Sequence, residues 1–486
     1  MSRKTQLKRW AAGLTLLLAI ASLAGKAEGA AQYMSYTLDW RNRRVAAPLG
    51  YVVEDVLTGI GQLEEPMRAP QDLFLDREEN LWIADTDGNR IIKMTRTGEV
   101  LLTITEADGV PLFGPQGVFV DDQTGEIYIA DTGNKRIVRL NPDLSVNKIY
   151  GAPKSLKLGP DFNFQPTKIV VDKSGNMFIV NGGDFHGFLQ MDSRGRFRQW
   201  FGANKVPFSI TRVLTRIFAS EQQRQQLTRV LPPPPSNAFL HPSGYMYVTS
   251  AFATTSQIKK LNAVGSNSFP EQFYGEVRVE NWTLVRPQFV DVAVDQNDIV
   301  SALDANTGRV YQYDQDGNTL LVFGGQGDQR GVFKYPSSLV VDSRGWLYVL
   351  DNQRNDIQVF RPTEFAQLVH RASDLYYKGE YQAAAELWRR VLDMNTNYEL
   401  AHKGIARNYY KDGEYRKAMI EYRLAHDKAG YSMAFAELRK EWARAHFPLL
   451  IGLVLLTILV LVGIGVAITL YVRAGWRRPG QAVEEA

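Results

Sequence analysis

The chain has 486 residues, of which 45% are hydrophobic and 22% are charged, and its formal net charge at pH 7 is +4. A net charge this small provides no basic face of the kind that binds nucleic acid. The sequence contains no cysteine, which excludes disulfides, metal–thiolate sites, thiol catalysis and cysteine lipidation. Any domain that this chain exports must therefore be stabilised by its hydrophobic core alone.

Residues 1–30 are typical of a secretory signal peptide. Basic residues between Arg3 and Arg9 precede the uncharged stretch 10–24, and small residues suited to cleavage come directly after it. The apolar stretch is shorter than the roughly 20 residues that an ordinary membrane span needs, although an uncleaved anchor is the alternative. Both interpretations place the segment after residue 30 outside the cytoplasm, and we expect residues 31–50 to form a linker.

One pattern occurs six times between Ala69 and Phe365: a polar or proline lead-in, a short apolar run ending in Asp, a turn, a second apolar run and a third strand. The first two copies read APQDLFLDREENLWIADTDGNRIIKM and GPQGVFVDDQTGEIYIADTGNKRIVRL. Runs rich in β-branched and aromatic residues, bounded by turn formers, indicate antiparallel strands. A repeat of about 50 residues with four strands in each unit predicts a six-bladed β-propeller.

The sixth copy supplies only three strands, because the pattern becomes helical after Phe360. The segment Tyr51–Pro66 has the same order of strand, glycine turn and proline as the end of the fifth copy, Thr319–Pro336. We therefore expect Tyr51–Leu57 to close the ring, so that the propeller occupies residues 51–365. Closure removes the unpaired strand edges that invite aggregation.

Two segments, IADTDGNRI (Ile83–Ile91) and IADTGNKRI (Ile129–Ile137), are close to the repeat core of the NHL family, and VLDNQRNDI (Val349–Ile357) is a looser copy. The chain thus resembles NHL-repeat propellers. The third, fourth and fifth blades depart from the repeat, with Asn181, Ser250 and Asp304 at the Asp position. The resemblance implies a fold and no particular activity, because propellers serve as binding modules, scaffolds and enzymes.

Six positions near the start of each blade's first strand are expected to surround one mouth of the central channel: Asp72, Gly117, Lys168, Asn237, Asp291 and Ser338. All except Gly117 are candidate ligand-binding residues, because two acids that face a lysine could hold a polar ligand or an ion. Alternatively, these side chains cap the strand starts and bind water in the channel. A second set, which ends the second strands, is predicted to accept backbone N–H groups in the following turns: Asp85, Asp131, Asn181, Ser250, Asp304 and Asp351.

The sequence predicts no catalytic residue and no resident cofactor or metal. A metal lyase of this fold needs several histidines at the channel, and the propeller contains only His186 and His241, the second at a blade Asp position. Gluconolactonase-like propellers, which this architecture resembles, hold a divalent ion with Glu, Asn and Asp. No Glu here matches that ligand set, although a divalent ion in the channel stays open. A metal-dependent hydrolase or lyase of that type is the alternative function.

Residues 204–230 form an insertion between the third and fourth blades. Ile210, Val213, Leu214, Ile217 and Phe218 recur at helical spacing, which predicts an amphipathic helix. This helix either packs on the propeller or docks on a partner or a membrane surface.

Residues 366–446 resemble tetratricopeptide repeats with a capping helix. The segments Ala372–Leu392 and Ala406–His426 align, and Gly379 and Gly413 are separated by the period of that family. The resemblance implies a concave groove that would bind an acidic peptide segment of a partner, with these candidates: Tyr376, Tyr377, Lys403, Arg407, Tyr410 and Lys411. Alternatively, the tyrosines pack between helices and the repeats are a rigid stalk.

Residues 447–472 form an uncharged run that predicts a transmembrane helix. The signal peptide orients this helix, and basic residues after Val472 agree with a short cytoplasmic tail at 473–486. The sequence thus predicts a single-pass protein of the cell membrane, with the bulk of the chain outside the cytoplasm. We expect a binding or scaffold protein whose propeller recognises a glycan or protein, and whose helical repeats hold a membrane or cell-envelope partner such as a transporter.

Overall fold

The computed structural model describes residues 34–204, 231–280 and 282–475. The expected signal peptide (1–30), nearly all of the expected helical insertion (204–230) and most of the tail (473–486) lie outside the described residues. The chain divides into two compact units, residues 1–398 and 399–486, which are described separately.

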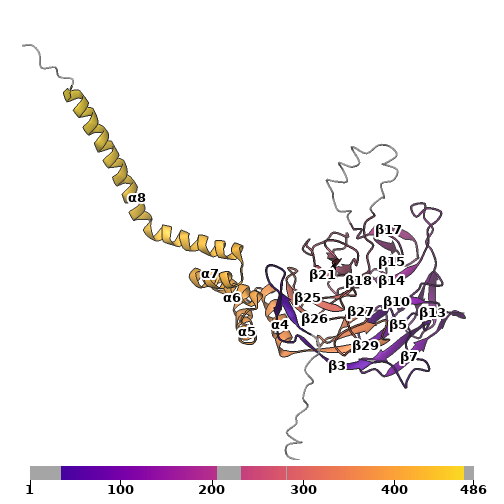
Figure 1. Ribbon diagram of the computed structural model, residues 1–486. Coiled ribbons are helices and arrows are strands. Elements are labelled where there is room, and N and C mark those ends of the chain that lie inside the picture. The colour runs from indigo at the N-terminus through magenta and orange to yellow at the C-terminus, as the bar shows by residue number, and fades with distance from the viewer. Residues whose placement is uncertain (1–33, 205–230, 281, 476–486) are drawn as a thin grey trace, which may run out of the picture. The chain divides into compact units, whose positions relative to one another are not determined.

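Six antiparallel sheets form the propeller within the described part of the first unit (Figure 1). Blade one contains β4 (Asp72–Leu75), β5 (Asn80–Asp85), β6 (Arg90–Thr95) and β7 (Val100–Ile104). Blade two contains β10 (Pro115–Val120), β11 (Ile127–Asp131), β12 (Arg136–Leu140) and β13 (Val146–Tyr150). Blade three contains β14 (Pro166–Val171), β15 (Met177–Asn181), β16 (Phe188–Met191) and β17 (Phe197–Phe201).

The remaining blades are less regular. Blade four contains β18 (Asn237–Leu240), β19 (Met246–Thr249) and β20 (Ile258–Leu261). Blade five contains β23 (Phe289–Val294), β24 (Val300–Asp304), β25 (Arg309–Tyr313) and β26 (Thr319–Gly324), and blade six contains β27 (Pro336–Val341), β28 (Leu347–Asp351) and β29 (Asp356–Pro362). Two short hairpins lie outside the blades: β8 (Glu106–Ala107) with β9 (Val110–Pro111), and β21 (Arg278–Glu280) with β22 (Thr283–Val285). Blade four therefore has three strands instead of the expected four.

The first strands of consecutive blades contact each other around a closed ring, from β4 through β10, β14, β18, β23 and β27 back to β4. Second strands such as β11 and β28 are buried along their whole length, because each blade packs between two others. Apolar residues at successive positions, and not only at alternate ones, are therefore buried. The hydrophobic core lies between the blades and surrounds the channel.

Strand β3 (Tyr51–Leu57) closes the ring, as the sequence comparison with the fifth copy predicts. It pairs antiparallel with β29, with Leu57 opposite Ile357 and Tyr51 opposite Pro362. The sixth blade therefore combines the two ends of the propeller segment in one sheet, and its outer edge is supplied by the beginning of the chain.

The expectation of a linker at 31–50 is wrong, because this segment contains β1 (Tyr36–Leu38) and β2 (Arg44–Ala46). Strand β1 pairs with β26, which extends blade five to six strands. The hydroxyl of Tyr36 donates to Glu276 over 2.6 Å, and the Arg44 guanidinium donates two hydrogen bonds of 2.8 Å to the same carboxylate. Two side chains of the added hairpin are thus fixed by one carboxylate that is distant in sequence.

Two helices, α4 (Glu364–Tyr377) and α5 (Tyr381–Met394), belong to the same unit as the propeller, which therefore continues past the expected boundary at residue 365. Helix α4 packs on blade five. Its buried His370 has Nε2 2.9 Å from Oε1 of Gln312. Burial lowers the pKa of His370. The backbone N–H of Asp316 donates to the Tyr377 hydroxyl over 3.2 Å.

The second unit contains α6 (Glu399–Lys411), α7 (Tyr415–Leu424) and α8 (Lys428–Gly475). Ala406, Ala418, Tyr422 and Ala434 form its small core. The expected capping helix and the expected membrane helix form one continuous helix, α8, which is long and apolar enough to cross a membrane by length and composition. The assignment of the helical region to tetratricopeptide repeats stays a prediction.

Candidate functional site

The structure brings the five candidate side chains at the channel mouth together, and we call them the polar ring: Asp72, Lys168, Asn237, Asp291 and Ser338. Four of them are buried and Lys168 is half-buried. They come from five different blades, each from the first strand. In blade two, the equivalent position is Gly117, which has no side chain to contribute.

Asp291 accepts four hydrogen bonds in the polar ring. The amide of Asn237 in blade four donates to Oδ1 over 2.6 Å, and the hydroxyl of Ser338 in blade six donates to Oδ2 over 2.5 Å. The backbone N–H groups of Val292 and Leu339 donate over 2.7 and 2.9 Å. Burial raises the pKa of Asp291 to about 6, and Lys168 opposes this effect. One carboxyl group thus joins three blades and titrates close to neutral pH.

Asp72 makes the matching connection through blades one to three. Its carboxylate accepts the N–H of Val118 in blade two over 3.0 Å and an ion pair from Lys168 in blade three. This ion pair joins blade three to blade one beside Gly117, the residue of blade two at the equivalent position. A Cβ at Gly117 would lie 2.6 Å from the Thr167 carbonyl oxygen, closer than such atoms pack, so the absence of a side chain allows blades two and three to approach.

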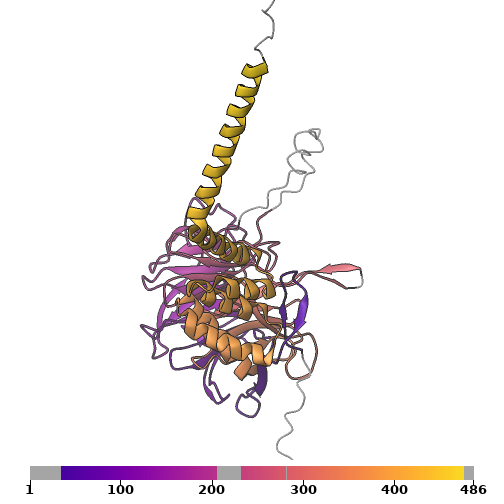
Figure 2. The same ribbon diagram turned by 90° about the vertical axis from the view of Figure 1, so that its left-hand side faces the viewer.

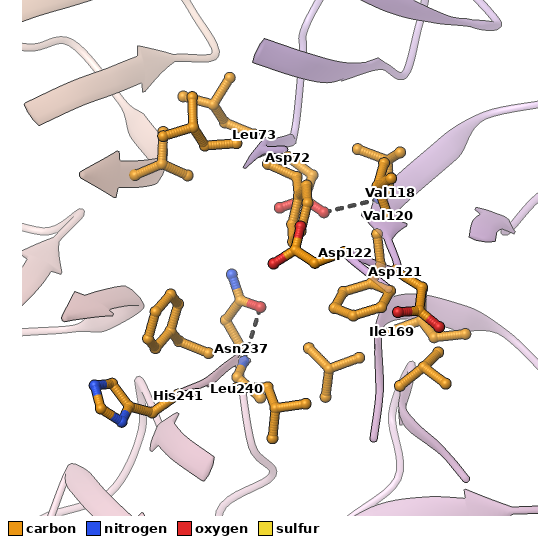
Figure 3. Close-up of a pocket in the computed structure, with 18 of the residues that line it drawn as sticks. Asp72, Leu73, Val118, Val120, Asp121, Asp122, Ile169, Asn237, Leu240 and His241 are labelled. Atoms are coloured by element: carbon orange, nitrogen blue, oxygen red, sulfur yellow. Dashed lines mark hydrogen bonds between the residues drawn. The ribbon is translucent and has the colours of Figure 1, made fainter. Parts of the chain in front are cut away.

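Three residues of the polar ring, Asp72, Asn237 and Asp291, border a cavity of about 450 Å³. Most of the lining is apolar, and half-buried Phe74, Phe239, Leu240 and Val340 contribute to it. Figure 3 shows the Asp122 carboxylate and the Asn237 amide extending toward the open space. Burial is the largest of the effects that raise the pKa of Asp122. A cavity of this volume, with an apolar wall and a few polar groups, is typical of small-molecule sites.

His241 lines the same cavity, and its side chain points away from the open centre in Figure 3. Its Nδ1 accepts the N–H of Ser243 over 3.3 Å, as Asp172 accepts the N–H of Ser174 over 2.8 Å in blade three. Burial lowers the pKa of His241, and Asp298 opposes this. His241 therefore takes the turn-capping role of the Asp that it replaces, as the sequence position predicts.

The second predicted set mainly holds the lead-in segments of the blades. Among the hydrogen bonds of the described residues, Asp304 and Asp351 also accept backbone N–H groups of the following turn, as predicted. Asp131 accepts the N–H of Phe113 over 2.8 Å and the Nε–H of Arg136 over 2.7 Å. Asp85 accepts from Arg68 and Arg90 in the same way. These carboxylates are fully buried and serve the fold. Three or more histidine, aspartate or glutamate side chains that could hold a metal ion are not found together in the described part of the chain.

The candidate groove residues lie on two helices. Tyr376 and Tyr377 are on α4, where the Tyr377 hydroxyl is engaged by Asp316 of blade five and burial raises its pKa. The other four lie on α6: Lys403, Arg407, Tyr410 and Lys411. Positions 403, 407 and 411 share one helix face, and the Arg407 guanidinium carbon is 5.8 Å from the centre of the Tyr410 ring.

Sequence reasoning missed the apolar character of the channel and the position of Asp122. The half-buried apolar side chains that line the cavity belong to runs that the strand pattern assigns to the core. A signal was available for Asp122, because it directly follows a blade Asp in GPQGVFVDD where the other blades carry a basic or neutral residue. Asp122 is therefore an additional polar group at the channel.

A family model described as NHL repeat matches residues 114–140, the segment that forms the first three strands of blade two. Among curated proteins, none matches this sequence.

Solved structures similar to this chain include a gluconolactonase from Xanthomonas campestris, with 13% identity, 68% of this chain and 96% of that chain covered, and a TM-score of 0.44. A streptogramin B lyase has 10% identity, with 64% and 98% covered and a TM-score of 0.40. Hydrazine synthase from Kuenenia stuttgartiensis has 10% identity, with 63% and 98% covered and a TM-score of 0.40. At these identities the likeness concerns the fold alone. The chain is a six-bladed β-propeller that carries an NHL repeat in its second blade, followed by a helical region with one candidate membrane-spanning helix.

Proposed function

We propose that this chain is a membrane-anchored, extracytoplasmic binding and scaffold protein. In this proposal the propeller recognises a glycan or protein ligand at the channel, α6 contributes to a groove for an envelope partner, and α8 anchors the chain with a short cytoplasmic tail. The observation that carries the proposal is the hydrogen bonding of the polar ring. Its carboxylates are engaged by neighbouring blades, which supports a rigid binding scaffold with an open cavity.

The cavity favours a ligand that presents an apolar face to the wall and a polar group to Asn237 or Asp122. Its volume is within the range of roughly 300–1,000 Å³ that small-ligand sites occupy. For a larger ligand, such as a glycan or a polypeptide, only one residue or side chain would enter the channel. The rigid ring of blades would hold the wall in place before binding, which lowers the entropic cost of association.

Ligand capture by the full chain in lipid nanodiscs tests this proposal. We expect a glycan and peptide array to identify a ligand whose binding is lost when Val340→Trp fills the channel. Leu156→Trp is the matched control, because Leu156 is fully exposed and does not line the cavity. Equal binding by the two variants would place recognition elsewhere on the propeller.

The partner role of α6 is tested by charge reversal. The double variant Lys403→Glu and Arg407→Glu should lose capture of an acidic partner segment in whole-cell crosslinking, because it reverses the charge of one helix face. Arg407 interacts with the buried Tyr422, so the unfolding temperature is measured as well, and loss of capture supports the proposal in a protein that remains folded. Arg416→Glu, on the exposed surface of α7, is the control. An unchanged crosslinking profile would reduce the helical region to a spacer.

One observation favours the alternative of an extracytoplasmic hydrolase or lyase. Asp291 borders the cavity and has a pKa raised to about 6, and carboxyl groups with raised pKa values occur at catalytic sites. Lactone and ester turnover by the full chain should be measured with and without Ca²⁺, Mg²⁺ or Zn²⁺. Metal-dependent turnover that disappears when Asp72 and Asp291 become Ala, in a protein that remains folded, would replace the binding proposal with the enzyme.

A further inference from the structure

The hairpin of β21 and β22 extends away from the blades between blades four and five. It appears in Figure 2 as the salmon ribbon that projects to the right of the propeller. Among the described residues its two strands form a two-stranded sheet of their own, with Val279 opposite Leu284 and Glu280 opposite Thr283. An isolated two-stranded hairpin has little intrinsic stability in water, so a contact outside the blades would stabilise it.

The hairpin exposes large apolar side chains. Val279 and Leu284 are cross-strand partners and are 70% and 52% exposed, and Val277, directly before β21, is 45% exposed. Trp282 at the turn is 100% exposed. Single exposed apolar residues are common on soluble proteins, whereas four within one short projecting element indicate an interaction surface.

Trp282 also has a backbone conformation that a tryptophan rarely adopts. Its φ is 63°, in the left-handed region that glycine and asparagine prefer in hairpin turns. A bulky residue at such a position costs on the order of 1 kcal/mol or more. Folding of the hairpin would favour glycine here, so the exposed indole is retained at a cost in stability.

We propose that the β21–β22 hairpin is a membrane-contact element, which inserts Trp282 and its apolar face into the headgroup region of a lipid bilayer. This inference rests on the proposed membrane anchoring by α8. Because α8 would anchor the same chain, a membrane contact of the propeller would form at a raised effective concentration, and a weak contact would suffice.

The residue types of the hairpin fit a bilayer interface better than a protein groove. Tryptophan concentrates at the headgroup level of membranes, where its apolar ring and polar N–H are both satisfied. Arg286 at the base of the hairpin is exposed, and a cation near a bilayer surface attracts anionic headgroups. Among the described strands, none pairs with the outer edges of this hairpin, and the backbone at the edge of an open sheet does not enter the hydrocarbon core. The contact must therefore be shallow, at the tip of the hairpin.

Site-directed spin labelling of the full chain tests this inference. Because the chain has no cysteine, Thr283→Cys introduces one thiol beside Trp282 for a nitroxide label. The full chain is reconstituted in vesicles of phosphatidylcholine and phosphatidylglycerol, and collision with oxygen is compared with collision with a water-soluble nickel complex. A label at Leu156→Cys is the matched control, since Leu156 is fully exposed far from β21 and β22 in sequence.

We expect a several-fold higher ratio of oxygen to nickel collisions at residue 283 than at residue 156. Adding Trp282→Gly, which also removes the strained conformation, should bring the ratio at 283 down to the control value while the protein still floats with the vesicles. Equal ratios at 283 and 156 in the parent chain would overturn the inference, and spin–spin broadening at 283 would assign the hairpin to a contact between copies. Failure of all variants to float would instead contradict the anchoring by α8.

Discussion

Blades two and four differ in the chemistry of the side chains between their second and third strands. In blade two, the buried carboxylate of Asp131 holds both the lead-in N–H of Phe113 and the guanidinium of Arg136. In blade four, Ser250 and Gln257 occupy the equivalent places. The Gln257 amide exchanges hydrogen bonds of 3.3 and 3.1 Å with the backbone of Tyr274. We call Asp131 with Arg136 the charged clasp of blade two, and Gln257 with the backbone of Tyr274 the neutral clasp of blade four.

The two clasps differ in what they require of the surrounding chain. A buried ion pair is stable only when both partners are in place and their remaining hydrogen bonds are satisfied. A buried glutamine needs only backbone groups, which any sequence can offer. Blade four is also where the chain departs most from the repeat, because residues 205–230 precede it and the β21–β22 hairpin follows it. The difference suggests that the neutral clasp tolerates additions that the charged one would not.

Removal of the charged clasp should have the largest effect on stability. Asp131→Ala leaves Arg136 and the Phe113 N–H without their buried partner, which should cost roughly 3–5 kcal/mol. Gln257→Ala in blade four removes the two neutral hydrogen bonds to the backbone of Tyr274 and should cost less, roughly 1–3 kcal/mol. Urea unfolding of the full chain in detergent measures both, and equal losses would show that the two clasps do not differ.

The close packing of blade two against blade three at Gly117 provides a second test of how the blades differ. Gly117→Val would place its Cβ against the Thr167 carbonyl, and relief of that overlap should cost about 1–3 kcal/mol. Asn237→Val, at the same position of blade four, removes the hydrogen bond to Asp291 without crowding and serves as the comparison. Retention of full stability by Gly117→Val would show that the two blades can separate at no cost.

The sequence predicts the repeat, the closing strand and the residues of the polar ring because all three follow from spacing. Stepping back four places from each first-strand Asp locates Asp72, Lys168 and Asp291 without knowledge of their contacts. It does not predict that Lys168 pairs with Asp72 across blade two, since this depends on the inter-blade distance that Gly117 permits. Sequence spacing determines which residues face the channel, whereas packing determines which of them meet.

Contacts between distant segments were not predictable for the same reason. The hairpin at 36–46 has too few apolar residues to be recognised as strands, and its stability depends on Glu276, more than 200 residues away. The docking of α4 on blade five uses polar contacts that include His370 with Gln312 and the Tyr377 hydroxyl with the N–H of Asp316. No local sequence pattern marks these partners.

Asp291 should make the stability of the chain depend on pH, because burial raises its pKa and its hydrogen-bond donors are neutral. The folded-state pKa of Asp291 is raised from 3.8 to about 6, so the folded chain binds the proton more tightly than the unfolded chain. Its contribution to stability therefore rises as pH falls from 7 to 4. Asp291→Asn should reduce this rise by roughly 1–2 kcal/mol. Unfolding free energies at both pH values measure it, and an unchanged pH dependence would contradict the raised pKa.

The smallest effect is expected from making blade four more like its neighbours at the turn after its first strand. His241→Asp would restore the carboxylate that accepts two backbone N–H groups in blade three, at 2.8 and 2.9 Å from Asp172. It would also bring a negative charge close to Asp298, whose Oδ1 is 3.6 Å from Nε2 of His241. The gained hydrogen bond and the added repulsion are of similar size, so stability at pH 7 should change by no more than about 0.5 kcal/mol.

A double-mutant cycle separates these two contributions. In the Asp298→Asn background the repulsion is absent, and His241→Asp should then stabilise the chain by about 0.5–1 kcal/mol. The difference between the two backgrounds measures the interaction between positions 241 and 298. If His241→Asp has the same effect in both backgrounds, Asp298 does not influence the turn, and the histidine of blade four is explained by the geometry of its own hydrogen bond to Ser243 alone.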